Sequence, residues 1–92
     1  MRVRWSASAI TDLRVTWLYI ADESPSRATR MLSRIRQAAL RLEQFPQLGR
    51  PGEQANAREL VVARSSYIVV YRLDGDAIEI LRVLHGAQRQ PD

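Results

Sequence analysis

The segment "AIEILRVL", Ala77 to Leu84, limits the fold of this chain more than any other part of the sequence. Its two faces are both apolar, with Ile78, Ile80 and Leu84 on one and Leu81 and Val83 on the other. A strand that is apolar on both faces is buried on both sides, so it belongs in the interior of a sheet. The Asp74-Gly75 pair just before it favours a tight hairpin with the preceding strand. We therefore expect an antiparallel sheet built around this segment.

Three other segments have the character of strands. "RVRW", Arg2 to Trp5, alternates polar and apolar residues, and "RELVVAR", Arg58 to Arg64, and "YIVVYRL", Tyr67 to Leu73, are rich in β-branched and aromatic residues. Residues Pro46 to Ala57 contain two prolines and two glycines without periodicity, so we expect one substantial loop there. Gln88 to Asp92 is expected to be a loose tail.

Two helices are predicted between the first and second strands. The first is capped by Ser6 or Ser8, and its predicted apolar stripe is Ile10, Leu13, Trp17, Ile20 and Ala21. Ser24 should cap the second helix, with Pro25 at its first position and Pro46 beyond its end. The apolar stripe of the second helix is Ala28, Met31, Leu32, Ile35, Ala38, Ala39 and Leu42, and Arg27, Arg30, Arg34, Arg36 and Arg41 lie largely off it.

The predicted order of elements is β-α-α-β-β-β. Two helices joined by a short connection form a helical hairpin, which would pack on one face of a small, mostly antiparallel sheet. The fold class is therefore α+β, and we expect residues 1–92 to form a single domain.

The charge of the chain indicates an acidic partner. All 14 basic residues are arginine and the net charge is +4, which favours binding to nucleic acid, an anionic groove or an acidic peptide. The absence of cysteine excludes disulfides and thiolate sites. The apolar runs are too short to span a membrane and no signal peptide is evident, so we expect a cytoplasmic protein. We expect no cofactor and no metal, because the sequence has no glycine-rich phosphate loop, metal-ligand spacing or nucleophile–histidine arrangement.

Three stretches together resemble the RelE/ParE superfamily of bacterial toxins from type II toxin–antitoxin pairs. "WSASAITDLRVTWLYIADESP" is similar to the family's first helix and the start of its second, and "LEQFPQLGRPG" to the end of the second helix and the next loop. "RELVVARSSYIVVYRLDGDAIEILRVLHGAQRQP" resembles the C-terminal sheet, most closely that of the ParE branch. The resemblance implies a cognate antitoxin whose C-terminal segment wraps around the toxin. It also implies one of two targets: ParE-like members are associated with inhibition of DNA gyrase, whereas RelE-like members cut mRNA on the ribosome.

The residues available for RNA cleavage are few. Attack by a 2′-hydroxyl needs a base, an acid and cations around the phosphorus. Arginine supplies charge but does not exchange protons near pH 7, so His85 is the natural acid or base, with Arg58, Arg64 and Arg82 as phosphate contacts. The alternatives are a strand-terminal His85 bonded to backbone or antitoxin, a solvated Arg82, and an Arg58 paired with a nearby carboxylate. The tail "GAQRQPD" lacks the aromatic residue that RelE-like nucleases tend to carry there.

We therefore predict a non-catalytic gyrase inhibitor neutralised by a ParD-like antitoxin. The alternatives are a ribosome-dependent mRNA endonuclease and a degenerate toxin that retains only antitoxin binding. The residues predicted to bind the antitoxin are Leu13, Trp17, Ile20, Arg58 and Arg82.

Overall fold

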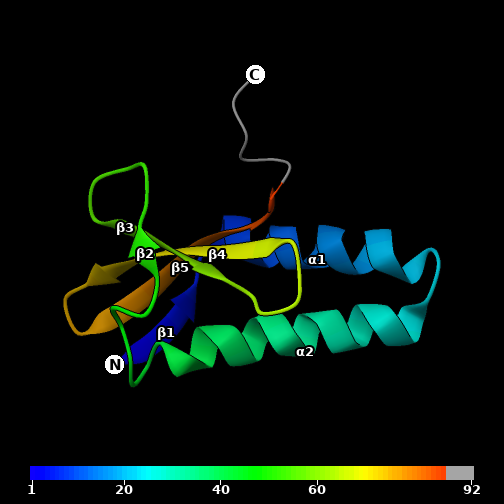
Figure 1. Cartoon of the computed structure of the whole chain (residues 1–92), viewed down its shortest axis with the longest axis horizontal. Helices are drawn as coiled ribbons and strands as arrows, with labels where there is room; N and C mark the ends of the chain where they lie inside the picture. Colours follow the sequence, from blue (N-terminus) through cyan, green and yellow to red (C-terminus); the bar gives the residue numbers. More distant parts are fainter. Residues whose placement is uncertain (87–92) are drawn as a thin grey trace.

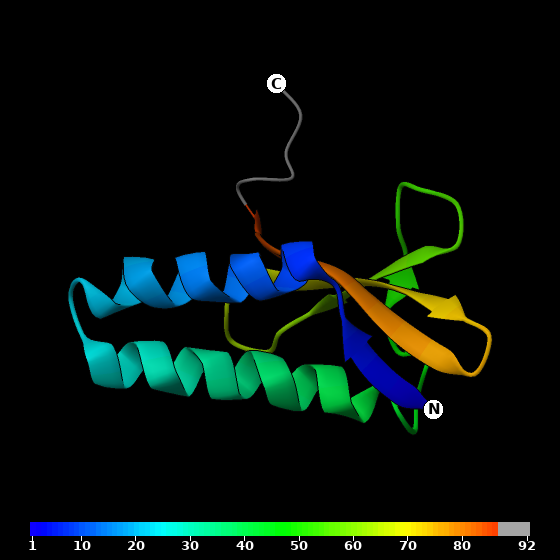
Figure 2. The same ribbon diagram turned by 180° about the vertical axis from the view of Figure 1, so that it is seen from behind.

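The computed structural model describes residues 1–86, and the predicted tail Gln88–Asp92 lies outside the described residues. Its elements are β1 (Arg2–Trp5), α1 (Ala7–Ala21), α2 (Pro25–Arg41), β2 (Arg50–Pro51), β3 (Ala57–Val61), β4 (Tyr67–Asp74) and β5 (Ala77–His85). The strands form one sheet in the order β1-β5-β4-β3-β2, in which only the β1–β5 pair is parallel. Helices α1 and α2 run antiparallel beside each other against the sheet (Figures 1 and 2). The predicted α+β architecture is confirmed.

Each helix begins where its serine cap predicts. The Ser6 hydroxyl accepts a hydrogen bond from the Ala9 amide and thereby selects Ser6 over Ser8 as the cap of α1. The Ser24 hydroxyl accepts from the Arg27 amide, and Pro25 occupies the first helical position of α2. The Ser6 hydroxyl also donates to the Leu81 carbonyl, so the cap of α1 is tied to β5.

The core lies between the helices and the inner face of the sheet. The predicted stripe of α2 is confirmed, because Ile35, Ala39 and Leu42 are fully buried and the remaining stripe residues are at least partly buried. On the sheet side, the fully buried core residues are Val69, Tyr71, Ile78 and Ile80. The outer face of the sheet carries ion pairs of Glu79 with Arg4 and Arg72.

The predicted apolar stripe of α1 is partly wrong. The buried residues are Ala9, Leu13 and Thr16, whereas Ile10 is 49% exposed. Helix α1 carries its own apolar residues on all sides, so their spacing does not select one face for burial. The end of the helical hairpin that joins α1 to α2 also projects beyond the sheet, which leaves part of α1 without a covering layer (Figures 1 and 2).

Strand β5 is interior, as predicted, but its faces differ from the prediction. Val70 is paired with Arg82 and Tyr71 with Ile80, so Leu81 is an extra residue in a β-bulge. The bulge shifts the alternation by one residue, and Val83 therefore joins Ile78 and Ile80 in the core. A simple two-residue period had placed Leu84 on that face.

The segment between α2 and β3 was expected to be a loop, but it contains the short strand β2. Arg50 is paired with Glu59 and Pro51 with Arg58 at the edge of the sheet, where proline is tolerated. Strand β3 ends at Val61, earlier than predicted, because the chain turns before Arg64, whose φ is 60°.

Candidate functional site

Arg58 of β3 has a structural role, because its guanidinium binds backbone carbonyls of the segment after α2. One guanidinium nitrogen, Nη1, lies 2.6 Å from the Gly49 carbonyl oxygen and 3.4 Å from that of Gln47. These hydrogen bonds hold the segment after α2 against β3. The alternative that Arg58 pairs with a carboxylate stays a prediction.

Tyr71, a fully buried residue of β4, holds the same segment after α2 from the core. Its buried hydroxyl accepts a hydrogen bond from the Gly49 amide at 2.9 Å and donates one to the Pro46 carbonyl at 2.8 Å. Burial raises the pKa of Tyr71 above its ordinary value of 10.0, and the Gly49 hydrogen bond and the Arg58 charge oppose that rise. A Cβ at Gly49 would lie 2.8 Å from both the Glu59 carbonyl oxygen and the tyrosine ring, so only glycine fits there without displacement.

Arg82 is held by a carboxylate from α1. Its Nε and Nη2 donate to the two oxygens of Asp12 at 2.8 and 3.0 Å. Asp12 Oδ2 also accepts from the Val83 amide at 2.8 Å, and the Asp12 side chain is only 14% exposed. The hydrogen bond to Asp12 is the main reason that the pKa of Arg82 lies above its ordinary value. Strand β1 pairs with β5 only as far as Ile80. Beyond that point, the Asp12 carboxylate accepts the hydrogen bond of the Val83 amide in place of a strand.

His85 lines a different feature, a cavity of about 250 Å³ beside α1. The cavity is lined by Val15, Thr16, Tyr19, Tyr67 and His85. The rings of Tyr67 and His85 meet edge to face, with 5.2 Å between their centroids. Burial raises the pKa of Tyr67, a hydrogen bond with Thr16 opposes that rise, and nearby Tyr19 adds to it.

The four residues considered for RNA cleavage do not converge. His85 is paired with Tyr67, whereas the partner of Arg58 is Tyr71, four residues or about 13 Å further along β4. The partner of Arg82 is Val70, three residues from Tyr67, so alternation directs Arg82 and His85 to opposite faces of the sheet.

Arg64 and His85 line different hollows, although the Gly86 amide donates a hydrogen bond to the Ser66 carbonyl in the turn that carries Arg64. Arg64 belongs to the turn between β3 and β4 and lines a groove with Arg34 and Arg41 of α2, whereas His85 faces α1. The sequence could not reveal the Tyr67–His85 contact, because it depends on the register between two strands.

The residues predicted to bind an antitoxin differ in exposure. Leu13 is buried in the core, and Trp17 and Ile20 are half-buried. The most exposed apolar residues of α1 are instead Val15, Leu18 and Tyr19, with exposed fractions of 57%, 60% and 78%. The signal that could have revealed them is the lack of any polar face on this part of α1.

Two further findings concern the described residues alone. No group of three or more His, Cys, Asp or Glu side chains within residues 1–86 gathers as metal ligands do. In the same range, neither helix combines the length and hydropathy that a membrane span requires.

Comparison with known proteins identifies the class to which this fold belongs. Residues 3–90 match the family described as the ParE toxin of the type II toxin-antitoxin system parDE. Y4kP of Sinorhizobium fredii, a protein named as a toxin, is 40% identical over 90 residues, which cover 98% of this chain and 93% of Y4kP. Toxin RelE2 of Caulobacter vibrioides is 36% identical over 87 residues, which cover 95% and 97% of the two chains.

Solved structures agree with this grouping. A chain of the chromosomal ParDE system from P. aeruginosa superimposes with a TM-score of 0.85 at 27% identity, covering 92% of this chain and 95% of that one. A chain of the RelBE2 toxin–antitoxin complex from Mycobacterium tuberculosis gives a TM-score of 0.64 at 26% identity, covering 91% and 95%. The fold is thus that of the ParE/RelE toxins of type II toxin–antitoxin systems. Within that class, this chain belongs to the ParE toxin family.

Proposed function

We propose that this toxin inhibits DNA gyrase and is not a nuclease, and that a ParD-like antitoxin neutralises it. The observation that carries the proposal is the separation of the candidate catalytic groups. Arg58 is bonded to backbone carbonyls, Arg82 is bonded to Asp12 of α1, and strand alternation directs His85 to the opposite face of β5 from Arg82. Cleavage of RNA needs acid, base and cations around one phosphorus atom. The higher TM-score to a ParDE chain than to a RelBE2 chain gives further support.

The test is expression of the toxin alone, with plasmid supercoiling and mRNA integrity measured in the same cells. Purified toxin should also inhibit supercoiling by purified gyrase. We expect altered supercoiling and induction of the DNA-damage response, without cuts phased to codons in ribosome-bound mRNA. Codon-phased cuts with unchanged supercoiling would overturn the proposal. Normal growth with normal antitoxin binding would identify a degenerate toxin.

A ribosome-dependent mRNA endonuclease is the second candidate, and the Tyr67–His85 contact is the observation that favours it. A tyrosine beside the only histidine provides two proton-bearing groups at the rim of one cavity. The His85→Ala variant separates the candidates, with Tyr19→Ala as a control on the same cavity. Under the gyrase proposal, His85→Ala retains toxicity, whereas loss of toxicity in a folded His85→Ala variant but not in Tyr19→Ala favours the nuclease.

We further propose that the antitoxin covers the apolar surface made of Val15, Leu18 and Tyr19. These side chains are adjacent on α1 and line one open hollow, and exposed apolar patches of this kind mark protein interfaces. The Leu18→Ser/Tyr19→Ser variant should bind the antitoxin at least tenfold more weakly, as measured by calorimetry. The matched control is Phe45→Ser/Leu48→Ser, which alters exposed apolar residues after α2. Equal losses in the two variants would contradict the assignment.

A further inference from the structure

Four arginines form a straight row along one flank of α2. At 100° per residue, Arg27, Arg30, Arg34 and Arg41 fall within an arc of about 60°. With a rise of 1.5 Å per residue, the row is about 21 Å long. The fifth arginine of this helix, Arg36, lies about 150° from the centre of the row.

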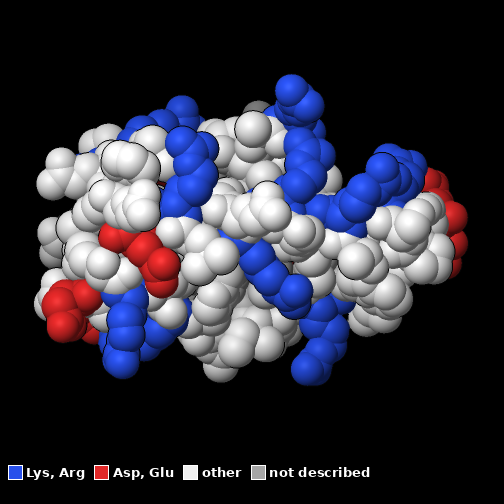
Figure 3. All heavy atoms as spheres, turned by 90° about the horizontal axis from the view of Figure 1, so that it is seen from below, with Lys and Arg blue, Asp and Glu red and all other residues white. Residues whose placement is uncertain are grey.

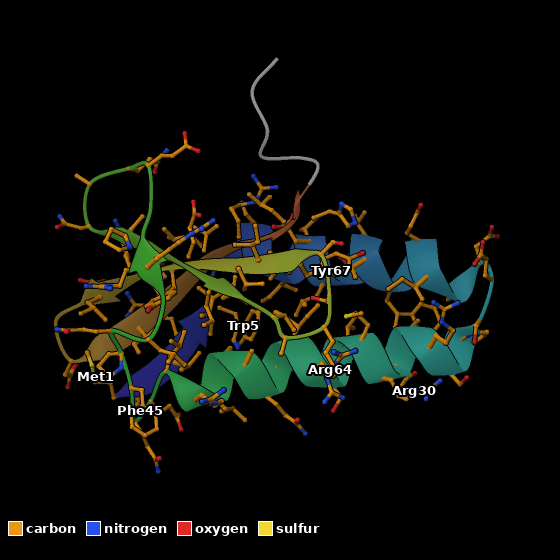
Figure 4. All side chains as sticks on the ribbon, in the orientation of Figure 1. Met1, Trp5, Arg30, Phe45, Arg64 and Tyr67 are labelled. Atoms are coloured by element: carbon orange, nitrogen blue, oxygen red, sulfur yellow. The ribbon has the colours of Figure 1, made fainter. Side chains whose placement is uncertain are left out.

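Arg64 joins the same surface from the sheet. The turn between β3 and β4 descends toward α2, where the Arg34 guanidinium donates a hydrogen bond to the Ala63 carbonyl (Figure 4). Arg34, Arg41 and Arg64 line a shared groove of about 360 Å³. We call the four arginines of the row together with Arg64 the α2 arginine row.

Among the described residues, no carboxylate neutralises the α2 arginine row. Helix α2 contains neither Asp nor Glu, and within residues 1–86 none of these five arginines forms an ion pair. By contrast, Arg4, Arg50 and Arg72 are each paired with a carboxylate. In Figure 3, the middle of the face seen from below shows arginine atoms without acidic atoms among them, and the acidic atoms lie toward its ends. Like charges three and four residues apart destabilise a helix, so the row weakens α2 unless an anion binds it.

We infer that the α2 arginine row binds the phosphate backbone of duplex DNA. A regular row of charges matches a rigid polymer with evenly repeated phosphates, and the guanidinium fork suits phosphate oxygens. Ser26, Ser33 and Gln37 border the row on its solvent side, and their hydroxyl and amide groups are also of the kind that contacts phosphate. The inference goes beyond the proposed function, because it concerns DNA itself and does not require gyrase.

The test is fluorescence anisotropy of a labelled 20-base-pair duplex titrated with the full-length toxin at several NaCl concentrations. The slope of log K against log salt is about −0.9 per phosphate contact, so Arg30→Gln/Arg41→Gln should make it less negative by about 1.8. We expect at least a tenfold loss of affinity at 100 mM NaCl. The matched control is Arg14→Gln/Arg36→Gln, which removes the same charge from exposed positions off the row. Neither arginine forms an ion pair within residues 1–86, and the control should change affinity less than threefold.

Three outcomes would overturn the inference. The first is absence of duplex binding at 50 mM NaCl, and the second is an equal loss in the two double variants. The third is tighter binding of poly-glutamate or of a 20-nucleotide single-stranded RNA than of the duplex. Circular dichroism checks the helix content of each variant. If the double variant unfolds, Arg30→Gln alone carries the test, with an expected slope change of about 0.9.

Discussion

Single polar side chains determine how the segment after α2 joins the sheet. The buried Tyr71 hydroxyl bridges the Gly49 amide and the Pro46 carbonyl, while Arg58 binds the Gly49 carbonyl. Buried backbone groups need such partners, because leaving one unpaired costs about 1–3 kcal/mol. A tyrosine in the core strand thus replaces the backbone hydrogen bonds that a loop lacks.

Tyr71→Phe should lower the free energy of unfolding at pH 7 by about 1–3 kcal/mol, since it leaves both backbone groups unpaired. Tyr19→Phe is the control, because Tyr19 is 78% exposed and its hydroxyl should matter little. Urea unfolding followed by circular dichroism measures both. Equal effects of the two substitutions would show that the Tyr71 bridge does not stabilise the fold.

The same residue should influence stability at alkaline pH. The folded-state pKa of Tyr71 is raised above the ordinary value of 10.0, so its stabilising contribution is complete below pH 10. That contribution is lost as the pH rises through the folded-state pKa. The free energy of unfolding of the native chain should therefore fall more steeply above pH 10 than that of Tyr71→Phe. Parallel declines in the two proteins would refute the assignment.

The Asp12 carboxylate performs two tasks that substitutions can separate. Asp12→Ala removes the partner of both Arg82 and the Val83 amide, and the unpaired amide alone should cost about 1–3 kcal/mol. Arg82→Gln should cost less, about 0–1 kcal/mol, because the Arg82 side chain is half exposed. Urea unfolding of the two single variants and the double variant measures the coupling. Equal costs for the single variants would mean that the Val83 hydrogen bond adds nothing.

The two helices differ in how clearly their sequences define a buried face. Helix α2 has a single apolar stripe and an arginine-rich remainder, and its buried residues are the predicted ones. Helix α1 is apolar on most sides, and only its contact with β5 and α2 decides which residues are covered. The apolar remainder of α1 stays exposed, and we propose it as the surface that the antitoxin covers.

At the level of the element, Ser24→Ala should destabilise α2 by about 1 kcal/mol, because its hydroxyl caps the Arg27 amide. For a chain of this size, that loss corresponds to a fall in melting temperature of about 4–8 °C. Ser33→Ala, at an exposed position in the middle of α2, is the control and should shift it far less. A thermal scan with equal shifts for the two variants would refute the cap.

The whole molecule combines an exposed apolar surface on α1 with positive charge on α2 that no carboxylate of residues 1–86 pairs with. An antitoxin that binds only the folded toxin stabilises it by mass action. At a free concentration 100 times the dissociation constant, the antitoxin should raise the free energy of unfolding by about 2.7 kcal/mol. Thermal scans at increasing antitoxin concentration measure this, and an unchanged melting temperature would show that the partner does not select the folded state.

The sequence alone was sufficient for the features that near neighbours control. The Ser24 cap with Pro25, the α2 stripe and the interior position of Ala77–His85 follow from local periodicity and turn chemistry. The same stretches carried the resemblance to the ParE/RelE toxins. Prediction failed for the two-residue strand β2, which is too short to show a period.

Only the tertiary structure decided which distant residues meet. The bulge at Leu81 changes which residues of β5 face the core. Asp12 binds Arg82, which lies 70 residues later in the chain, and the ring of Tyr67 contacts that of His85. These contacts depend on strand register and on how α1 crosses the sheet, and local propensity does not encode either. The candidate site was therefore only partly predictable: its residue types were visible in the sequence, but their separation into distinct places was set by the packing of helices on the sheet.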